Sequence, residues 1–120
     1  MRTLEIGTKR FTKVFADARG IGGASHKYYI ARAGESEGGL FSEFGLVSFQ
    51  DGAIGDVGVN GCHNEDLLAI VLDRLQSFQS GDFKCRENAL AITKIEEALH
   101  WLDHRTKDRE RRGVEGTLKQ

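Results

Sequence analysis

The chain has 120 residues, of which 17 are Lys or Arg and 18 are Asp or Glu, so its net charge is -1. This length predicts a single small unit with a modest core, and the near-zero charge argues against a surface built to bind nucleic acid. The two cysteines form no CxxC or Cys/His array, which argues against a disulfide framework or a zinc site. No apolar stretch suits a signal peptide or a membrane span, which predicts a soluble cytoplasmic protein.

Residues 1–60 are rich in glycine, aromatic and β-branched residues and show no helical periodicity, which predicts a small antiparallel β-sheet. The expected strands are Arg2–Ile6, Phe11–Phe15, His26–Arg32, Leu46–Gln50 and Ala53–Val59. Asp51-Gly52 predicts a hairpin turn between the last two, because glycine accepts the positive φ that such a turn requires. Gly20–Gly23 and Glu37–Gly39 are expected to be flexible connections.

Residues 61–120 change to a helical pattern. Asn64 is the expected N-cap of a first helix, since acidic residues follow it and suit the positive end of the helix dipole. Its apolar face comprises Leu68, Val71, Leu75 and Phe78. Ser80–Asp82 is expected to end this helix with glycine at the C′ position.

A second helix is predicted from about Cys85 to near Gly113, and the short loop before it favours an antiparallel hairpin. Its apolar stripe comprises Ile92, Ile95, Leu99 and Leu102. The fold class is therefore α+β. An N-terminal antiparallel sheet, residues 1–60, precedes a two-helix hairpin, residues 61–120, that is expected to form the oligomer and the ligand pocket within one compact unit.

The apolar stripe of the second helix has polar groups at both ends, with Asn88 before it and Arg105 and Arg109 after it. Helical rise separates Asn88 from Arg105 by roughly 25 Å, so no small ligand touches both within one chain. Two antiparallel copies around a two-fold axis would bring the two residues together. Alternatively, these polar residues only solvate the ends of a core helix.

Other residues allow a functional or a purely structural interpretation. The ring of Phe78 could stack on a purine or belong to the core. The cations near the end of the second helix could bind phosphate or pair with neighbouring acids; they are Arg105, Lys107, Arg109, Arg111 and Arg112. His100 and His104 stand at i and i+4, but a third ligand and the His-Glu-x-x-His signature are missing. No catalytic residue, metal or cofactor is predicted.

A resemblance to a known family is carried by residues Gly58–Thr117, which read GVNGCHNEDLLAIVLDRLQSFQSGDFKCRENALAITKIEEALHWLDHRTKDRERRGVEGT. This run resembles the phage family called Thoeris anti-defence protein one, and its helical hairpin also resembles the second anti-CBASS protein family. The resemblance implies a sponge in the cytoplasm of the infected bacterial host. Members bind and hide cyclic ADP-ribose isomers made by TIR-domain proteins, such as glyco-cyclic ADP-ribose, without cleaving them.

The resemblance also implies residues and partners. The family's stacking Phe, pocket Asn and helix-borne arginines fall on Phe78, Asn88, Arg105 and Arg109. A homodimer that holds the ring between protomers is implied, as is a homohexamer built as a trimer of dimers, with separate sites for cyclic di- or trinucleotides. Candidates for that second site are Arg112, Gly113 and Thr117. No membrane and no nucleic acid polymer is expected as a partner.

Two alternatives remain open from the sequence. The first is an enzyme that degrades the same cyclic nucleotide signal, for which His100, His104 and Glu97 are the best candidates. The second is a nucleic-acid-binding or structural phage protein that uses the arginines or the hairpin in another way.

Overall fold

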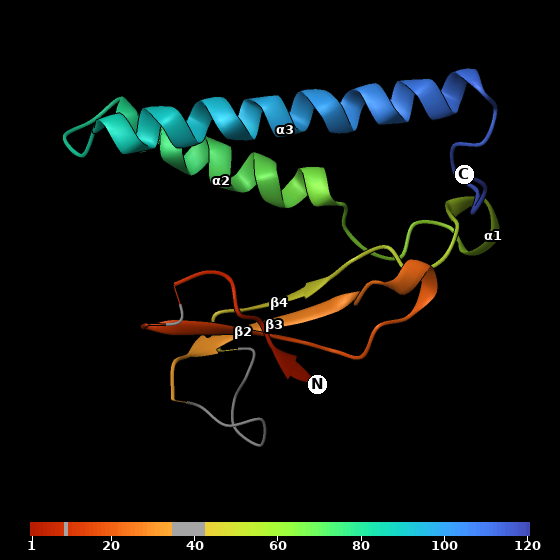
Figure 1. Ribbon diagram of the computed structural model, residues 1–120, viewed down its shortest axis with the longest axis horizontal. Coiled ribbons are helices and arrows are strands. Elements are labelled where there is room, and N and C mark those ends of the chain that lie inside the picture. Colours follow the sequence, from red (N-terminus) through yellow and green to blue (C-terminus); the bar gives the residue numbers. More distant parts are fainter. Residues whose placement is uncertain (9, 35–42) are drawn as a thin grey trace. The chain divides into compact units, whose positions relative to one another are not determined.

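The computed structural model describes residues 1–8, 10–34 and 43–120. The chain divides into two compact units, Met1–Cys62 and His63–Gln120. The first unit contains a four-stranded antiparallel sheet and the second a helical hairpin (Figure 1), which confirms the α+β class. Among the described residues, no helix is both long enough and apolar enough to span a bilayer.

The sheet is a simple meander in which each strand pairs with the next one along the chain, in the order β1-β2-β3-β4. The strands are β1 (Arg2–Thr3), β2 (Thr12–Ala16), β3 (Lys27–Arg32) and β4 (Gly45–Ser48). Four of the five expected strands are thereby confirmed, although β1 and β4 are shorter than expected. Phe15 pairs with Tyr29, so Phe15 and Ala31 lie on one face of the sheet, and both are buried.

The fifth expected strand, Ala53–Val59, is wrong. Residues Ile54–Val57 form a short helix, α1, whose first turn begins at the buried residue Ala53. The carbonyl oxygen of Ala53 accepts hydrogen bonds from the amides of Asp56 and Val57, both at 2.9 Å. The apolar residues of this segment therefore follow a helical turn, although their spacing also allows a strand.

Asp51-Gly52 does not start a β-hairpin, although Gly52 has the expected positive φ of 99°. The side chain of Asn60 bonds the backbone of Asp51 on both sides, accepting from its amide at 2.8 Å and donating to its carbonyl at 2.7 Å. The Gln50 amide group donates to the carbonyl of Gly58 at 2.8 Å. Side chains thus satisfy backbone groups that a strand ladder would otherwise pair.

The connection Gly20–Gly23 contains a short 3₁₀ turn, η1 (Ile21–Gly23). Gly22 and Gly23 both have positive φ, at 77° and 83°, which explains why glycine occurs twice here. The second expected connection, Glu37–Gly39, lies outside the described residues.

At the end of the sheet unit the chain returns alongside β4 through a very close backbone approach at Gly61. Cys62 forms a parallel bridge with Phe49, in which its amide donates to Ser48 and its carbonyl accepts from Gln50, both at 2.9 Å. A Cβ atom on Gly61 would lie 2.3 Å from the carbonyl carbon of Phe49. Only glycine fits this position without a backbone shift.

The substitution Gly61→Ala is therefore expected to lower the free energy of unfolding by about 1–3 kcal/mol, as overpacking of a close-packed site does. The matched control is Gly45→Ala in β4, because its new methyl group would meet only the Ile30 side chain at an ordinary 3.7 Å. Urea unfolding measures both changes. Equal unfolding midpoints for the two variants would contradict the close approach.

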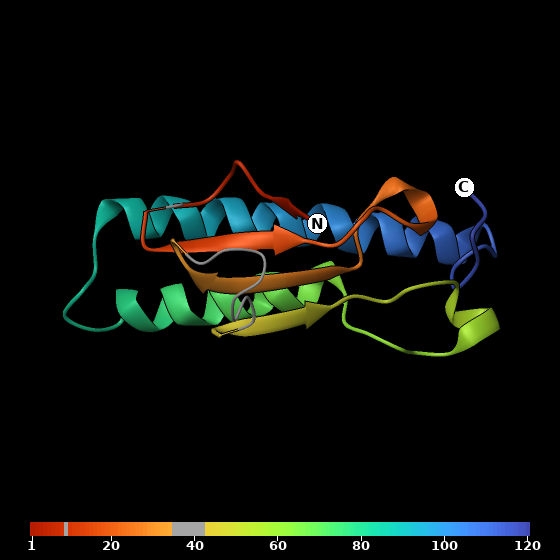
Figure 2. The same cartoon turned by 90° about the horizontal axis from the view of Figure 1, so that it is seen from below.

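The second unit contains α2 (Asn64–Gln79) and α3 (Arg86–Arg111), which lie side by side and antiparallel in both views (Figures 1 and 2). The N-cap of α2 is His63, one residue before the expected Asn64. The reason is the Asp66 carboxylate, which reaches back to accept a hydrogen bond from the His63 amide at 2.9 Å.

The end of α2 also differs in detail from the expectation. The helix stops at Gln79 as expected, but Gly81 does not take the positive φ of a glycine C′ residue. The Ser80 hydroxyl donates to the carbonyl of Gln76 at 3.0 Å, and the amide of Gly81 donates to the carbonyl of Phe78 at 3.1 Å. Local hydrogen bonds therefore end this helix.

Candidate ligand-binding residues on the helical hairpin

Phe78 lies at the C-terminal end of α2 in an aromatic and cationic environment. Its ring is half-buried, and Phe83 from the turn meets it edge to face, with centroids 6.2 Å apart. The Arg74 guanidinium, one helical turn earlier, lies 5.0 Å from the centroid of the Phe78 ring. Such a ring attracts cations and also offers a flat surface on which a base can stack.

Asn88 lies in the first turn of α3, at the same end of the hairpin as Phe78. Its side-chain amide donates to the carbonyl of Phe83 at 3.4 Å. On the other side of the turn, the Gln79 side chain accepts a hydrogen bond from the amide of Cys85 at 2.8 Å. Phe83 therefore contacts both Phe78 and Asn88, and the structure brings these two predicted residues together. Sequence reasoning missed Phe83 and Arg74, although Arg74 stands at the i, i+4 spacing from Phe78.

Arg105 lies much farther along α3 and is exposed. It follows Asn88 by 17 residues, which a helical rise of 1.5 Å per residue converts to roughly 25 Å. Within the described part of the chain its guanidinium has no hydrogen-bond or ion-pair partner. Five N–H donors are thus available to a ligand. One chain does not bring Arg105 to Phe78 and Asn88.

Arg109 has a different environment from Arg105, because the C-terminal tail folds over it. The residue is only 6% exposed. Its guanidinium donates to the carbonyls of Val114 at 2.9 Å, Thr117 at 3.0 Å and Lys119 at 2.7 Å, and its Nε lies 3.4 Å from the Glu115 carboxylate. We call this set of contacts the Arg109 clasp. Most donors of this side chain are therefore occupied within the chain.

The backbone prepares the tail for the clasp. Gly113 follows α3 with a φ of 72°. The amide of Val114 donates to the carbonyl of Arg109, and that of Gly113 to the carbonyl of Glu110, both at 3.1 Å. This hydrogen-bond pair is the Schellman motif, which reverses the chain after a helix. The reversal directs the tail carbonyls toward the Arg109 guanidinium.

The three candidates for a second site lie in this same C-terminal turn. The Arg112 Nε donates to the Asp108 carboxylate at 3.0 Å, and Gly113 makes the reversal just described. The Thr117 hydroxyl donates to the carbonyl of Val114 and accepts from the amide of Lys119 at 3.2 Å. These contacts have a role in tail folding, and a cyclic oligonucleotide site here stays a prediction.

His100 and His104 both meet the ring of Trp101 edge to face, at centroid distances of 5.4 Å and 5.7 Å. Trp101 itself is 65% exposed. Among residues 1–8, 10–34 and 43–120, no group of three His, Cys, Asp or Glu side chains is placed to hold a metal ion. The rings of the two histidines and Trp101 form an exposed aromatic cluster on α3.

Replacing the clasp residue should release the tail. Arg109→Ala is expected to speed amide hydrogen exchange at Thr117 and Lys119 and to lower the free energy of unfolding by roughly 1–3 kcal/mol, because carbonyls lose a charged donor. Arg111→Ala is the control, since its exposed side chain pairs with Asp108 alone among the described residues and its loss should cost less than about 0.5 kcal/mol. Exchange that is the same in both variants would show that the tail is held by other contacts.

Comparison with known proteins adds a family match. Residues 46–107 match the family described as Acb2/Tad1, hairpin domain. The chain is also similar to a protein named Thoeris anti-defense 1 from Bacillus phage SBSphiJ7, with 52% identity over 93 residues, which are 74% of this chain and 66% of the relative. The chain thus spans about two thirds of that relative's length. The family match includes Phe78, Asn88 and Arg105 and ends before Arg109.

Proposed function

The chain belongs to the Acb2/Tad1 hairpin-domain family, and on this premise we propose that it is a phage protein that counteracts Thoeris defence by binding and sequestering cyclic ADP-ribose isomers. The name of its relative, Thoeris anti-defense 1, supports the anti-Thoeris role. The observation that carries the choice of ligand is the arrangement along α3. An aromatic and amide site lies at its N-terminal end, and near the other end lies the Arg105 guanidinium, which no described residue pairs with.

Each of these groups suits one part of a cyclic ADP-ribose ring. Phe78 provides a face for the purine, and stacking on an aromatic ring contributes ~1–3 kcal/mol per base. The Asn88 side chain provides its carbonyl acceptor and the N–H donor that Phe83 does not use for polar atoms of the ring. Arg105 provides a fork of donors for the diphosphate, at roughly 1.5–3 kcal/mol for each charge-assisted hydrogen bond.

A complete site on this proposal needs two chains, because α3 separates Asn88 from Arg105 by roughly 25 Å. In an antiparallel pair, Asn88 of one protomer would lie near Arg105 of its partner, and the same contact would occur twice. Apolar side chains are available for such an interface, since Ile70, Leu90 and Trp101 are 64%, 47% and 65% exposed. The proposed assembly is therefore a homodimer, and the homohexamer built as a trimer of dimers stays a prediction.

Sequestration requires affinity and slow release rather than chemistry. A protein that holds the signal intact lowers its free concentration by mass action, so a binding surface is sufficient. Phe78, Asn88 and Arg105 would bind the ligand by stacking and hydrogen bonding, and the proposal gives none of them a role in proton transfer. The alternative, an enzyme that degrades the signal, would need a general acid and base at the bound ring.

The proposal is tested by calorimetric titration of the full chain with glyco-cyclic ADP-ribose. Phe78→Ala, Asn88→Ala and Arg105→Ala are each expected to weaken binding by about tenfold or more, because each removes a stacking surface or a hydrogen bond to the ligand. Lys94→Ala is the control, because its exposed side chain pairs with no described residue other than Glu97. Affinity that stays the same in all three variants while the wild type binds would refute the site.

A further inference from the structure

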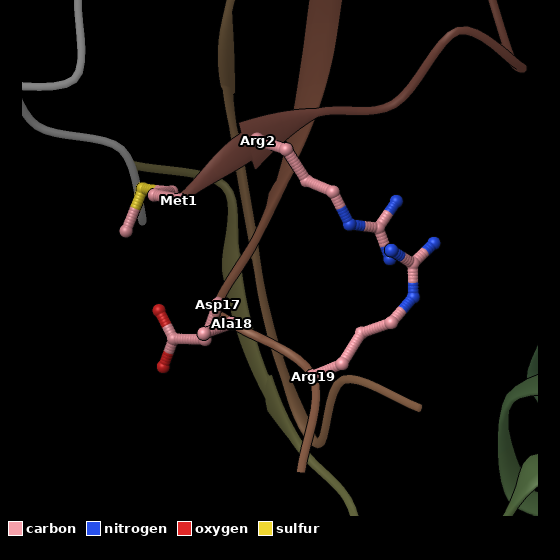
Figure 3. Close-up of a pocket in the computed structure, with 5 residues that line it drawn as sticks. All are labelled: Met1, Arg2, Asp17, Ala18 and Arg19. Atoms are coloured by element: carbon pink, nitrogen blue, oxygen red, sulfur yellow. The ribbon is translucent and has the colours of Figure 1, made fainter. Parts of the chain in front are cut away.

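The sheet unit contains a pocket of about 240 Å³ that the proposed function does not use (Figure 3). Its lining residues are Met1, Arg2, Asp17, Ala18 and Arg19. The strand register creates it, because Arg2 of β1 pairs with Ala16 at the end of β2 and so lies beside the segment that follows. Sites for drug-sized ligands measure roughly 300–1,000 Å³, so this pocket suits one small group.

Arg2 is held in the pocket by a buried hydroxyl group. Its Nη2 donates to the Oγ of Ser25 at 3.2 Å, and Ser25 in turn donates to the carbonyl of Asp17 at 2.7 Å. Ser25 is only 4% exposed. The Nε of Arg2 is shielded from solvent and has no acceptor among the described residues. Buried donors in folded proteins are normally paired with protein, ordered water or an ion.

Arg19 adds a second positive charge to the same pocket. In Figure 3 the side chains of Arg2 and Arg19 converge, whereas the carboxylate of Asp17 points away from them. That carboxylate accepts a hydrogen bond from the hydroxyl of Tyr29 at 3.1 Å. Within the described residues, neither arginine has an ion pair. Two guanidinium groups that converge without a counter-charge repel each other, and an anion between them would remove this cost.

We propose that the pocket of Arg2 and Arg19 binds a phosphate group. Two guanidinium forks match the charge and the several acceptor oxygens of a phosphate, and arginine binds such groups with paired, parallel hydrogen bonds. This site goes beyond the proposed function, because all of its residues belong to the sheet unit and none is a predicted cyclic ADP-ribose contact.

The test is a titration of the full chain with sodium phosphate at constant ionic strength, followed by NMR of the arginine Nε–Hε groups. The signals of Arg2 and Arg19 are expected to shift and saturate. Arg19→Gln and Arg2→Gln should each weaken phosphate binding by about tenfold or more. Arg10→Gln makes the same charge change outside the pocket, where Arg10 lies over the ring of Phe11, and should leave binding unchanged.

Arg19→Gln decides the outcome if Arg2→Gln unfolds the sheet, because Arg19 is exposed and makes no hydrogen bond or ion pair with the described residues. Shifts that rise linearly without saturation, or that are equal in wild type and Arg19→Gln, would overturn the proposal as an adventitious ion only. A parallel titration with adenosine 5′-monophosphate separates the sources of the phosphate. Tighter binding of the nucleotide assigns the site to a nucleotide phosphate, and equal binding assigns it to free phosphate. Failure here would leave the calorimetry of the hairpin variants unaffected.

Discussion

Helix α3 holds Asn88 and Arg105 roughly 25 Å apart, and this fixed separation constrains any binding site that uses both residues. A helix of 26 residues does not bend enough to bring them together. A ligand that needs both groups must therefore lie between chains, where antiparallel packing repeats the same contact around a two-fold axis. The local contacts of Phe83 with Phe78 and Asn88 prepare only one half of such a site.

The contrast between Arg105 and Arg109 shows how neighbouring turns of one helix acquire different roles. Both residues continue the apolar stripe of α3 beyond its C-terminal end, and both are candidate phosphate ligands by residue type and spacing. Arg105 is exposed and unpartnered among the described residues, whereas the Arg109 clasp uses the Schellman turn at Gly113 to bring three backbone carbonyls to one guanidinium. A role for Arg109 in organising the tail and a role in ligand binding now need separate measurements.

Helices α2 and α3 and most strands could be predicted because their signals are local. Apolar periodicity located α3, and short β-rich runs located β2 and β3. Helix α1 was missed because side-chain bonds from Asn60 and Gln50 replace the ladder that a strand would need. The Arg109 clasp depends on backbone carbonyls, which every residue has, so the residue types of the tail do not predict it. The pocket of Arg2 and Arg19 likewise depends on strand register, which places Arg2 beside residues 15 to 17 positions later in the chain.

The most direct test of sequestration is recovery of the bound molecule. The full chain would be loaded with glyco-cyclic ADP-ribose, freed of excess ligand, denatured by heat, and its supernatant separated by chromatography. Sequestration predicts that the ring returns intact after prolonged incubation, in an amount that matches the protein loaded. A cleaved product formed in proportion to time would contradict it and would identify the chain as an enzyme that degrades the signal.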